Sequence, residues 1–208
     1  MTIVFSLIIY IICCIIFIAM DFLKDVEKAL PVLADGGLIL FPADEWWAMG
    51  CDATNPEAAY KLLTTGIQYA HPYLHLLVAE EKDILRFVPT PGIKIYDYLA
   101  GADKPSYAIY ENVSGIAPVL LLEKDSMAIR QTNSRFCHSL LKRFKRPIMT
   151  IAASLPDTNP PGYFSDIPEE LLKQADYAVE YRRSLKLITR PSSVVRWHND
   201  GSISIFLS

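Results

Sequence analysis

The chain has 208 residues, a length that suits one domain with at most a small appendage. Its 51% hydrophobic content is enough for a sizeable core, and its formal net charge of −3 argues against a general polyanion-binding surface. The four cysteines form no C-x-x-C pair, which argues against a zinc site and a disulfide framework and favours a reducing, cytoplasmic environment. We predict no metal site, because Pro72 separates His71 from His75 and breaks their helical spacing.

The first segment is apolar throughout. From Thr2 to Met20 there is no charged residue, and this length is close to the roughly 20 apolar residues that span a bilayer. A secretory signal peptide fits poorly, because no Lys or Arg precedes the stretch and no A-x-A site follows it. Residues 1–19 therefore either precede a true start at Met20 or form a transmembrane anchor. We favour the misplaced start, because the amphipathic pattern of the domain, residues 20–208, begins at once without a polar spacer.

The first half of the domain predicts alternating helices and strands. Apolar residues at helical spacing predict a helix over residues 21–35, which Pro31 is expected to kink or shorten. A short buried strand is expected over 38–41. A loop then carries the sequence Asp44-Glu45-Trp46-Trp47 and leads into a helix over 56–63, with an asparagine N-cap and a proline at its first position.

The second half continues the alternation. Further strands are expected over 74–78, 107–110, 126–130 and 147–152, and helices over 81–87, 94–99, 133–144 and 168–174. The chain closes with strands over 193–197 and 202–206, joined by Asn199-Asp200-Gly201, a strong hairpin signal. The pattern predicts a single α/β domain with a twisted mixed β-sheet flanked by helices and a C-terminal β-hairpin.

Five short segments, in order and with suitable spacing, resemble one protein family. They are Gly36-Gly37-Leu38-Ile39-Leu40-Phe41-Pro42, Gly50-Cys51-Asp52-Ala53-Thr54-Asn55, Ser126-Met127-Ala128-Ile129-Arg130, Ala152-Ala153-Ser154 after a proline-led strand, and Pro191-Ser192-Ser193-Val194-Val195. Together they are similar to the YrdC-like family of the threonylcarbamoyl-AMP synthase type. The resemblance runs from about Asp21 to the C-terminus, and it implies the α/β fold predicted above.

The resemblance also implies a reaction and a set of site residues. Family members combine Mg-ATP, bicarbonate and L-threonine into threonylcarbamoyl-AMP and pyrophosphate, for tRNA modification, and double-stranded RNA binding is described for the family. Carried over by motif, the nucleotide- and substrate-binding positions are Asp44, Trp47, Arg130, Ser154, Ser192 and Ser193. Several of these positions also have a structural interpretation. Arg130 can pair with a carboxylate, Ser192 and Ser193 can close a turn, and a tryptophan beside a strand can serve packing alone.

Four parts of the family's site are changed here. Family members carry P-T-D-T-x-[YW]-G, whereas this chain has Ala43 and Glu45 in place of the two threonines, and the acid is expected to repel anionic substrates. The family's K-x-R falls within residues 64–68, which hold neither lysine nor arginine. The S-A-N residues are Ala152-Ala153-Ser154, and the arginine of the last strand falls near Phe206 or Leu207. The sequence therefore predicts that synthase activity is reduced or lost. The alternative is a non-catalytic paralogue that binds a nucleotide, double-stranded RNA or a protein.

Two basic clusters bear on the RNA interpretation. They are Lys142, Arg143, Lys145 and Arg146, at the end of a predicted helix, and Arg182, Arg183, Lys186 and Arg190. Positive charge at a helix C-terminus is favourable whatever the function. Because the domain is not basic overall, a solvated face is the favoured interpretation.

Overall fold

A computed structural model describes residues 22–65, 74–89, 95, 106–187, 193–197 and 203–207. Its strands are β1 Ile39–Pro42, β2 Trp47–Asp52, β3 Leu74–Val78, β4 Ser106–Tyr110, β5 Met127–Gln131, β6 Ile148–Ala152, β7 Tyr177–Ala178, β8 Ser193–Trp197 and β9 Ile203–Leu207. Its helices are a first helix over 22–34, α2 Pro56–Leu63, α4 Arg135–Phe144 and α5 Glu169–Gln174. Short 3₁₀ turns are η1 Glu81–Arg86, η2 Pro118–Leu120, η3 Glu123–Asp125 and η4 Phe164–Asp166.

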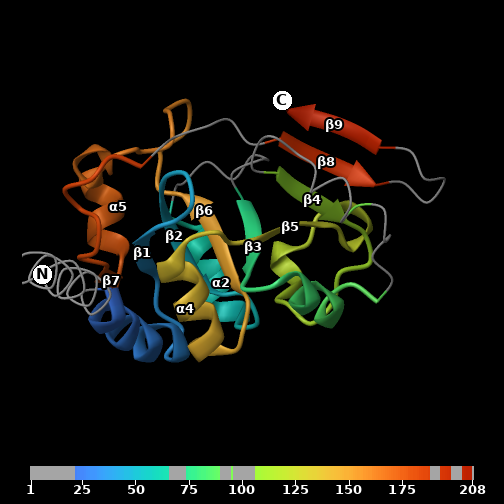
Figure 1. Ribbon diagram of the computed structural model, residues 1–208, viewed down its shortest axis with the longest axis horizontal. Coiled ribbons are helices and arrows are strands. Elements are labelled where there is room, and N and C mark those ends of the chain that lie inside the picture. Colours follow the sequence, from blue (N-terminus) through green and yellow to red (C-terminus); the bar gives the residue numbers. More distant parts are fainter. Residues whose placement is uncertain are drawn as a thin grey trace, which may run out of the picture.

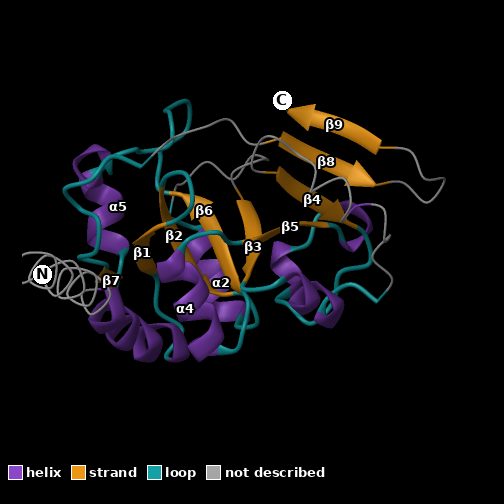
Figure 2. Ribbon diagram, viewed as in Figure 1, coloured by secondary structure: helices purple, strands orange, loops and turns teal. Residues whose placement is uncertain are grey.

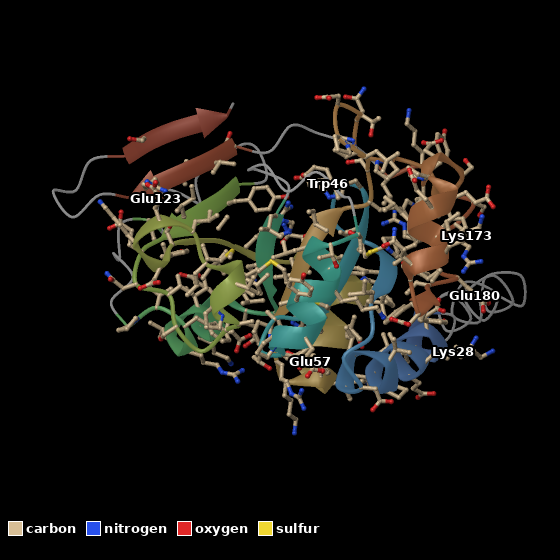
Figure 3. The ribbon with its side chains drawn as sticks, turned by 180° about the vertical axis from the view of Figure 1, so that it is seen from behind. Lys28, Trp46, Glu57, Glu123, Lys173 and Glu180 are labelled. Atoms are coloured by element: carbon tan, nitrogen blue, oxygen red, sulfur yellow. The ribbon has the colours of Figure 1, made fainter. Side chains whose placement is uncertain are left out.

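All described strands join one sheet, in the order β7-β1-β2-β6-β3-β5-β4-β8-β9. The sheet is mixed, because β7 runs parallel to β1, β3 to β5 and β4 to β8, and the other neighbours are antiparallel. Helix α4 covers one face of the central strands (Figure 1), and α2 covers the other, as the view from behind shows (Figure 3). Strands β8 and β9 form the C-terminal hairpin at the sheet edge (Figure 2). The predicted α/β class, mixed sheet and hairpin are confirmed.

Helices α2 and α4 form for the reasons their sequences indicate. The Asn55 side chain accepts hydrogen bonds from the backbone N–H groups of residues 57 and 58, at 2.9 and 3.2 Å, and Pro56 opens α2. Ser134 caps α4 in the same way, and that helix ends at Lys145, which adopts a left-handed conformation with φ 61°. The α4 face that packs on the sheet carries the buried residues Phe136, Cys137, Leu140, Leu141 and Phe144.

Strand β2 was predicted as loop, and that prediction is wrong. All six residues of β2 are buried, because the strand lies between β1 and β6 in the sheet and is covered on both faces. Its sequence therefore lacks the alternation that marks a half-exposed strand. Gly50 adds to the loop-like appearance, yet it is required here, because a Cβ would lie 2.7 Å from the carbonyl oxygen of Met149 on β6. The two-residue β7 was also not predicted.

Two predicted helices differ in the structure. The first helix is not shortened at Pro31 but continues to residue 34, and the Glu27 carbonyl that loses its bond belongs to an exposed residue that water can reach. The predicted helix over 81–87 is the 3₁₀ turn η1. Within the expected helix over 94–99 only residue 95 is described, and it is helical. The remainder of that helix and the Asn199-Asp200-Gly201 turn lie outside the described residues.

A buried carboxylate joins the first helix to β7 and the residues that follow it. Asp25, 3% exposed in the first helix, accepts hydrogen bonds from the backbone N–H groups of Glu180 and Tyr181 and from the Tyr177 hydroxyl. An exposed ion pair between Lys28 and Glu180, 3.1 Å from Nζ to Oε1, lies beside it (Figure 3). Hydrogen bonds to a charged group each contribute about 1.5–3 kcal/mol, so the buried contacts of Asp25 matter more than the surface pair.

No helix in the described ranges is both long and apolar enough to cross a membrane. Residues 1–20, on which the anchor interpretation depends, lie outside those ranges.

The two described cysteines are expected to be chemically silent in the folded protein. Cys51 and Cys137 are buried, and burial, followed by the nearby Asp52 and Asp44 carboxylates respectively, raises the pKa of each thiol to about 12. Near pH 8 the reactive thiolate is thereby reduced about a thousandfold relative to an unfolded chain. In protein that starts at Met20, a disulfide reagent should detect neither thiol before unfolding and both after it. Rapid reaction of either thiol in native protein would contradict this packing.

Candidate anion site around Arg130

The centre of the candidate site is a guanidinium that already has partners. Arg130 lies near the end of β5 and is 5% exposed. Its Nη1 donates to Glu45 Oε1 at 3.0 Å and to the Tyr107 hydroxyl at 2.9 Å. The guanidinium also lies over the Tyr107 ring, 4.9 Å from the ring centroid. The residue that the sequence identifies as an anion binder is therefore held by a carboxylate from the turn between β1 and β2.

A second carboxylate completes the cluster. Asp44 Oδ2 lies 3.6 Å from Arg130 Nε, and its side chain is 9% exposed. The Thr132 hydroxyl donates to Asp44 at 3.2 Å, and the Asn133 backbone N–H donates to it at 2.9 Å. These bonds link the β1–β2 turn to the segment between β5 and α4.

The charge balance of this cluster is unfavourable for an added anion. One guanidinium faces the two carboxylates of Asp44 and Glu45, and the side chains of Arg130 and Glu45 are only 4% and 3% exposed. Burial by itself lowers the pKa of Arg130. The neighbouring Tyr107 and the two carboxylates outweigh that effect, so this pKa lies above its ordinary value. The arginine is therefore a fixed cation whose charge is already matched inside the protein.

Aromatic rings surround the cluster. The His75 ring on β3 lies 4.5 Å from that of Tyr107, with an interplanar angle of 59°. Trp46, 5% exposed, follows Glu45 directly and lies in the middle of the molecule (Figure 3). Low-dielectric surroundings strengthen the pairing of the charged groups they enclose.

The structure brings two of the predicted site residues, Asp44 and Arg130, into contact. Trp47 is wholly buried and packs edge-on against Phe164, with ring centroids 5.0 Å apart. Ser154 is 4% exposed at the end of β6, and its backbone N–H donates to the Ala152 carbonyl. A ligand role for Trp47 or Ser154 stays a prediction.

The last two predicted site residues lie on or beside β8. Ser193 begins this strand, is half-buried, and pairs with Ser106 of β4. Within the described ranges no hydrogen bond or ion pair joins Ser193 to Arg130, and Ser192 lies outside those ranges. The two threonines at the expected K-x-R position, Thr64 and Thr65, donate their hydroxyl protons to carbonyls of α2 and so serve to end that helix.

Sequence reasoning missed three partners of the cluster. Tyr107 was recognised only as part of a strand, and Thr132 only as a residue between elements. Glu45 was recognised as a substitution, but its predicted effect was repulsion of substrate, whereas its carboxylate pairs with Arg130 across 85 positions of sequence. The available signal was a pair of adjacent acids, Asp44 and Glu45, and one arginine, all within apolar surroundings where a buried charge needs a partner.

Among residues of the described ranges, no group of three or more His, Cys, Asp or Glu side chains could hold a metal ion.

Comparison with known proteins places the chain in a family. The profile of the Sua5/YciO/YrdC family, described as telomere recombination, matches residues 31–206. The chain belongs to this family. A threonylcarbamoyl-AMP synthase of Pseudoalteromonas translucida is 23% identical over 172 residues, which are 81% of this chain and 91% of the relative. Another, from Hahella chejuensis, is 26% identical over 152 residues, 66% of this chain and 74% of that protein.

Solved structures of Sua5/YciO/YrdC members share the fold. E. coli YciO superimposes with a TM-score of 0.74 at 17% identity, covering 88% of each chain. A P. abyssi Sua5 complexed with L-threonine gives 0.71 at 14% identity, with 86% of this chain and 52% of that one covered. At such identities the likeness establishes the architecture, and the YrdC-like resemblance read from the sequence motifs is confirmed.

Proposed function

We propose that this Sua5/YciO/YrdC domain does not sustain threonylcarbamoyl-AMP synthesis from ATP, bicarbonate and L-threonine and serves as a non-catalytic binding domain. The observation that carries the proposal is the neutralisation of Arg130 by Glu45 and Asp44 inside the protein. A substrate anion at this guanidinium would have to displace a buried carboxylate or join two of them, and both alternatives are unfavourable.

The chemistry of the reaction supports the same conclusion. Attack on the α-phosphorus of ATP expels pyrophosphate, and its growing negative charge must be stabilised by Lys, Arg or Mg²⁺ placed at the transition-state oxygens. The family's lysine and arginine are absent from residues 64–68. Loss of one such contact reduces the rate about a hundredfold, and the expected loss with several changed positions is larger.

The substrates to test are those of the relatives. The curated relatives bear the name threonylcarbamoyl-AMP synthase, and a P. abyssi Sua5 structure contains L-threonine. Mg-ATP, bicarbonate and L-threonine are therefore the reactants that this chain would use if it were active. Double-stranded RNA stays a prediction from the family resemblance.

Pyrophosphate release from Mg-ATP, bicarbonate and L-threonine tests the proposal directly. Protein starting at Met20 is expected to release pyrophosphate at least about a thousandfold more slowly than a synthase relative assayed alongside it. Isothermal titration should be run on the same sample, to separate absent ATP binding from absent turnover. Turnover within about tenfold of the relative would refute the proposal.

A further inference from the structure

A second candidate site lies at the opposite end of α4 from Arg130. There the structure has a pocket of about 400 Å³ between the C-terminal end of α4, η1 and the start of β6. Helix α4 begins close to the Arg130 cluster, because Ser134 follows Thr132 and Asn133 directly. Its ten residues rise about 15 Å, so the pocket and the cluster are separate.

Four cations line this pocket, and two of them are already paired. Lys142 Nζ lies 2.6 Å from Glu80 Oε1, and Arg146 Nη1 lies 2.5 Å from Oδ2 of the buried Asp52. These pairs hold both side chains at the rim of the pocket. The paired carboxylates largely cancel the positive charge that a ligand would otherwise meet there.

The other two cations have no such partner. Arg86 and Lys145 form no ion pair with a carboxylate in the described part of the chain. Arg86 Nη2 donates to the Lys145 carbonyl at 3.3 Å, and its guanidinium lies over the Phe87 ring, 5.6 Å from the ring centroid. Asp83 is the one acid that lines the pocket, and its Oδ2 accepts the Glu80 backbone N–H at 3.0 Å. Arg86 and Lys145 therefore bring two positive charges to the pocket, against the single negative charge of Asp83.

The floor of the pocket is apolar. Val78, Phe87, Leu141 and Pro147 are buried and line it beneath the cations. Small-molecule sites commonly combine such a floor with a few polar groups in pockets of about 300–1,000 Å³. The ligand that fits has an apolar body and a compact anionic group.

We infer that this pocket binds a small organic phosphomonoester, with its phosphate between Arg86 and Lys145 and its organic body on the apolar floor. A phosphomonoester carries about −1.5 to −2 charges at pH 7, which matches two cations better than a single carboxylate does. Arginine supplies a planar fork for two phosphate oxygens, and lysine supplies a point charge.

Nearby charges oppose one alternative ligand, an extended polyanion. Duplex RNA would run past Glu80, which pairs with Lys142 at the rim, and past Glu81 in η1. The partial negative charge of the α4 C-terminus is about half an electron charge, which is smaller than the positive charge that Arg86 and Lys145 carry together. The Lys145 N–H also bonds the Leu141 carbonyl, which removes one exposed acceptor from the pocket.

The test uses phenyl phosphate, with inorganic phosphate and benzyl alcohol as separate probes of the anion and the body. Isothermal titration on protein starting at Met20 is paired with methyl NMR, in which the Val78 and Leu141 signals should shift. In Arg86→Gln/Lys145→Gln the affinity is expected to fall at least about tenfold. A matched control, Lys24→Gln/Arg135→Gln, makes the same charge change away from the pocket and should alter the affinity less than about twofold.

Three outcomes would overturn the inference. They are no binding of phenyl phosphate up to about 10 mM, equal loss of affinity in both double variants, or tight binding of duplex RNA without any binding of phenyl phosphate. The Arg86→Gln/Lys145→Gln variant leaves the Arg130 cluster intact, so its pyrophosphate release is expected to equal that of the wild type whether or not it binds phenyl phosphate. This separates failure of the inference from failure of the proposed function.

Discussion

Replacing Arg130 by methionine is expected to lower the free energy of unfolding by about 3–5 kcal/mol near pH 7. Methionine fills much of the same volume but leaves the carboxylates of Glu45 and Asp44 buried beside each other without a cation. Urea denaturation of the variant and the wild type, both starting at Met20, measures the difference.

The double variant Arg130→Met/Glu45→Leu removes the cation with one of its carboxylates and should recover most of the loss. A single variant within about 1 kcal/mol of wild type at pH 7 would show that the buried cluster is not formed.

Glu45→Gln is expected to create anion binding that the wild type lacks. Glutamine keeps the size of glutamate and an oxygen that can accept from Arg130 Nη1, but it removes one of the two negative charges. At an effective dielectric constant near 20, removing a charge about 4 Å away changes the interaction energy with an anion by up to about 4 kcal/mol. About 1.4 kcal/mol is enough to change the binding affinity tenfold. Sulfate and L-threonine should therefore bind the variant at least about tenfold more tightly.

The control for this experiment is Glu57→Gln. Glu57 is an exposed residue in the first turn of α2 (Figure 3), so its replacement changes the net charge equally without touching the cluster. Comparing the two variants removes the general stabilisation that sulfate gives to any folded protein. If the wild type binds both ligands as tightly as Glu45→Gln, internal neutralisation does not block the site, and the proposed function loses its main support.

Much of the architecture could be predicted from local sequence. The Asn55-Pro56 pair places the start of α2, because a capping side chain and a proline without an N–H both suit the first turn. Apolar periodicity defines the buried face of α4, and short apolar runs between turn residues identify β3, β4, β5 and β6 within a residue or two. The ordered motifs add the family, which the profile match over residues 31–206 establishes.

The missed elements are those whose sequence carries no local signal. Strand β2 is buried on both faces and contains Gly50, so neither alternation nor β propensity marks it. Its pairing with β1 and β6 is decided by how the sheet assembles. Strand β7 is two residues long and depends on the parallel edge of β1 and on the buried carboxylate of Asp25 in the first helix.

The sequence by itself determined most of the order of helices and strands, the family, and the absence of lysine and arginine from residues 64–68, since these depend on neighbours in the chain. Only the tertiary structure decided the role of Glu45, and it alone decided which basic residues are paired with a carboxylate. Glu45 meets Arg130 across 85 positions, and Arg86 meets the end of α4 across 59. Burial makes these long-range contacts decisive, because a charge removed from water needs a partner of opposite charge. Which partner lies nearby depends on the packing of strands that are far apart in the chain.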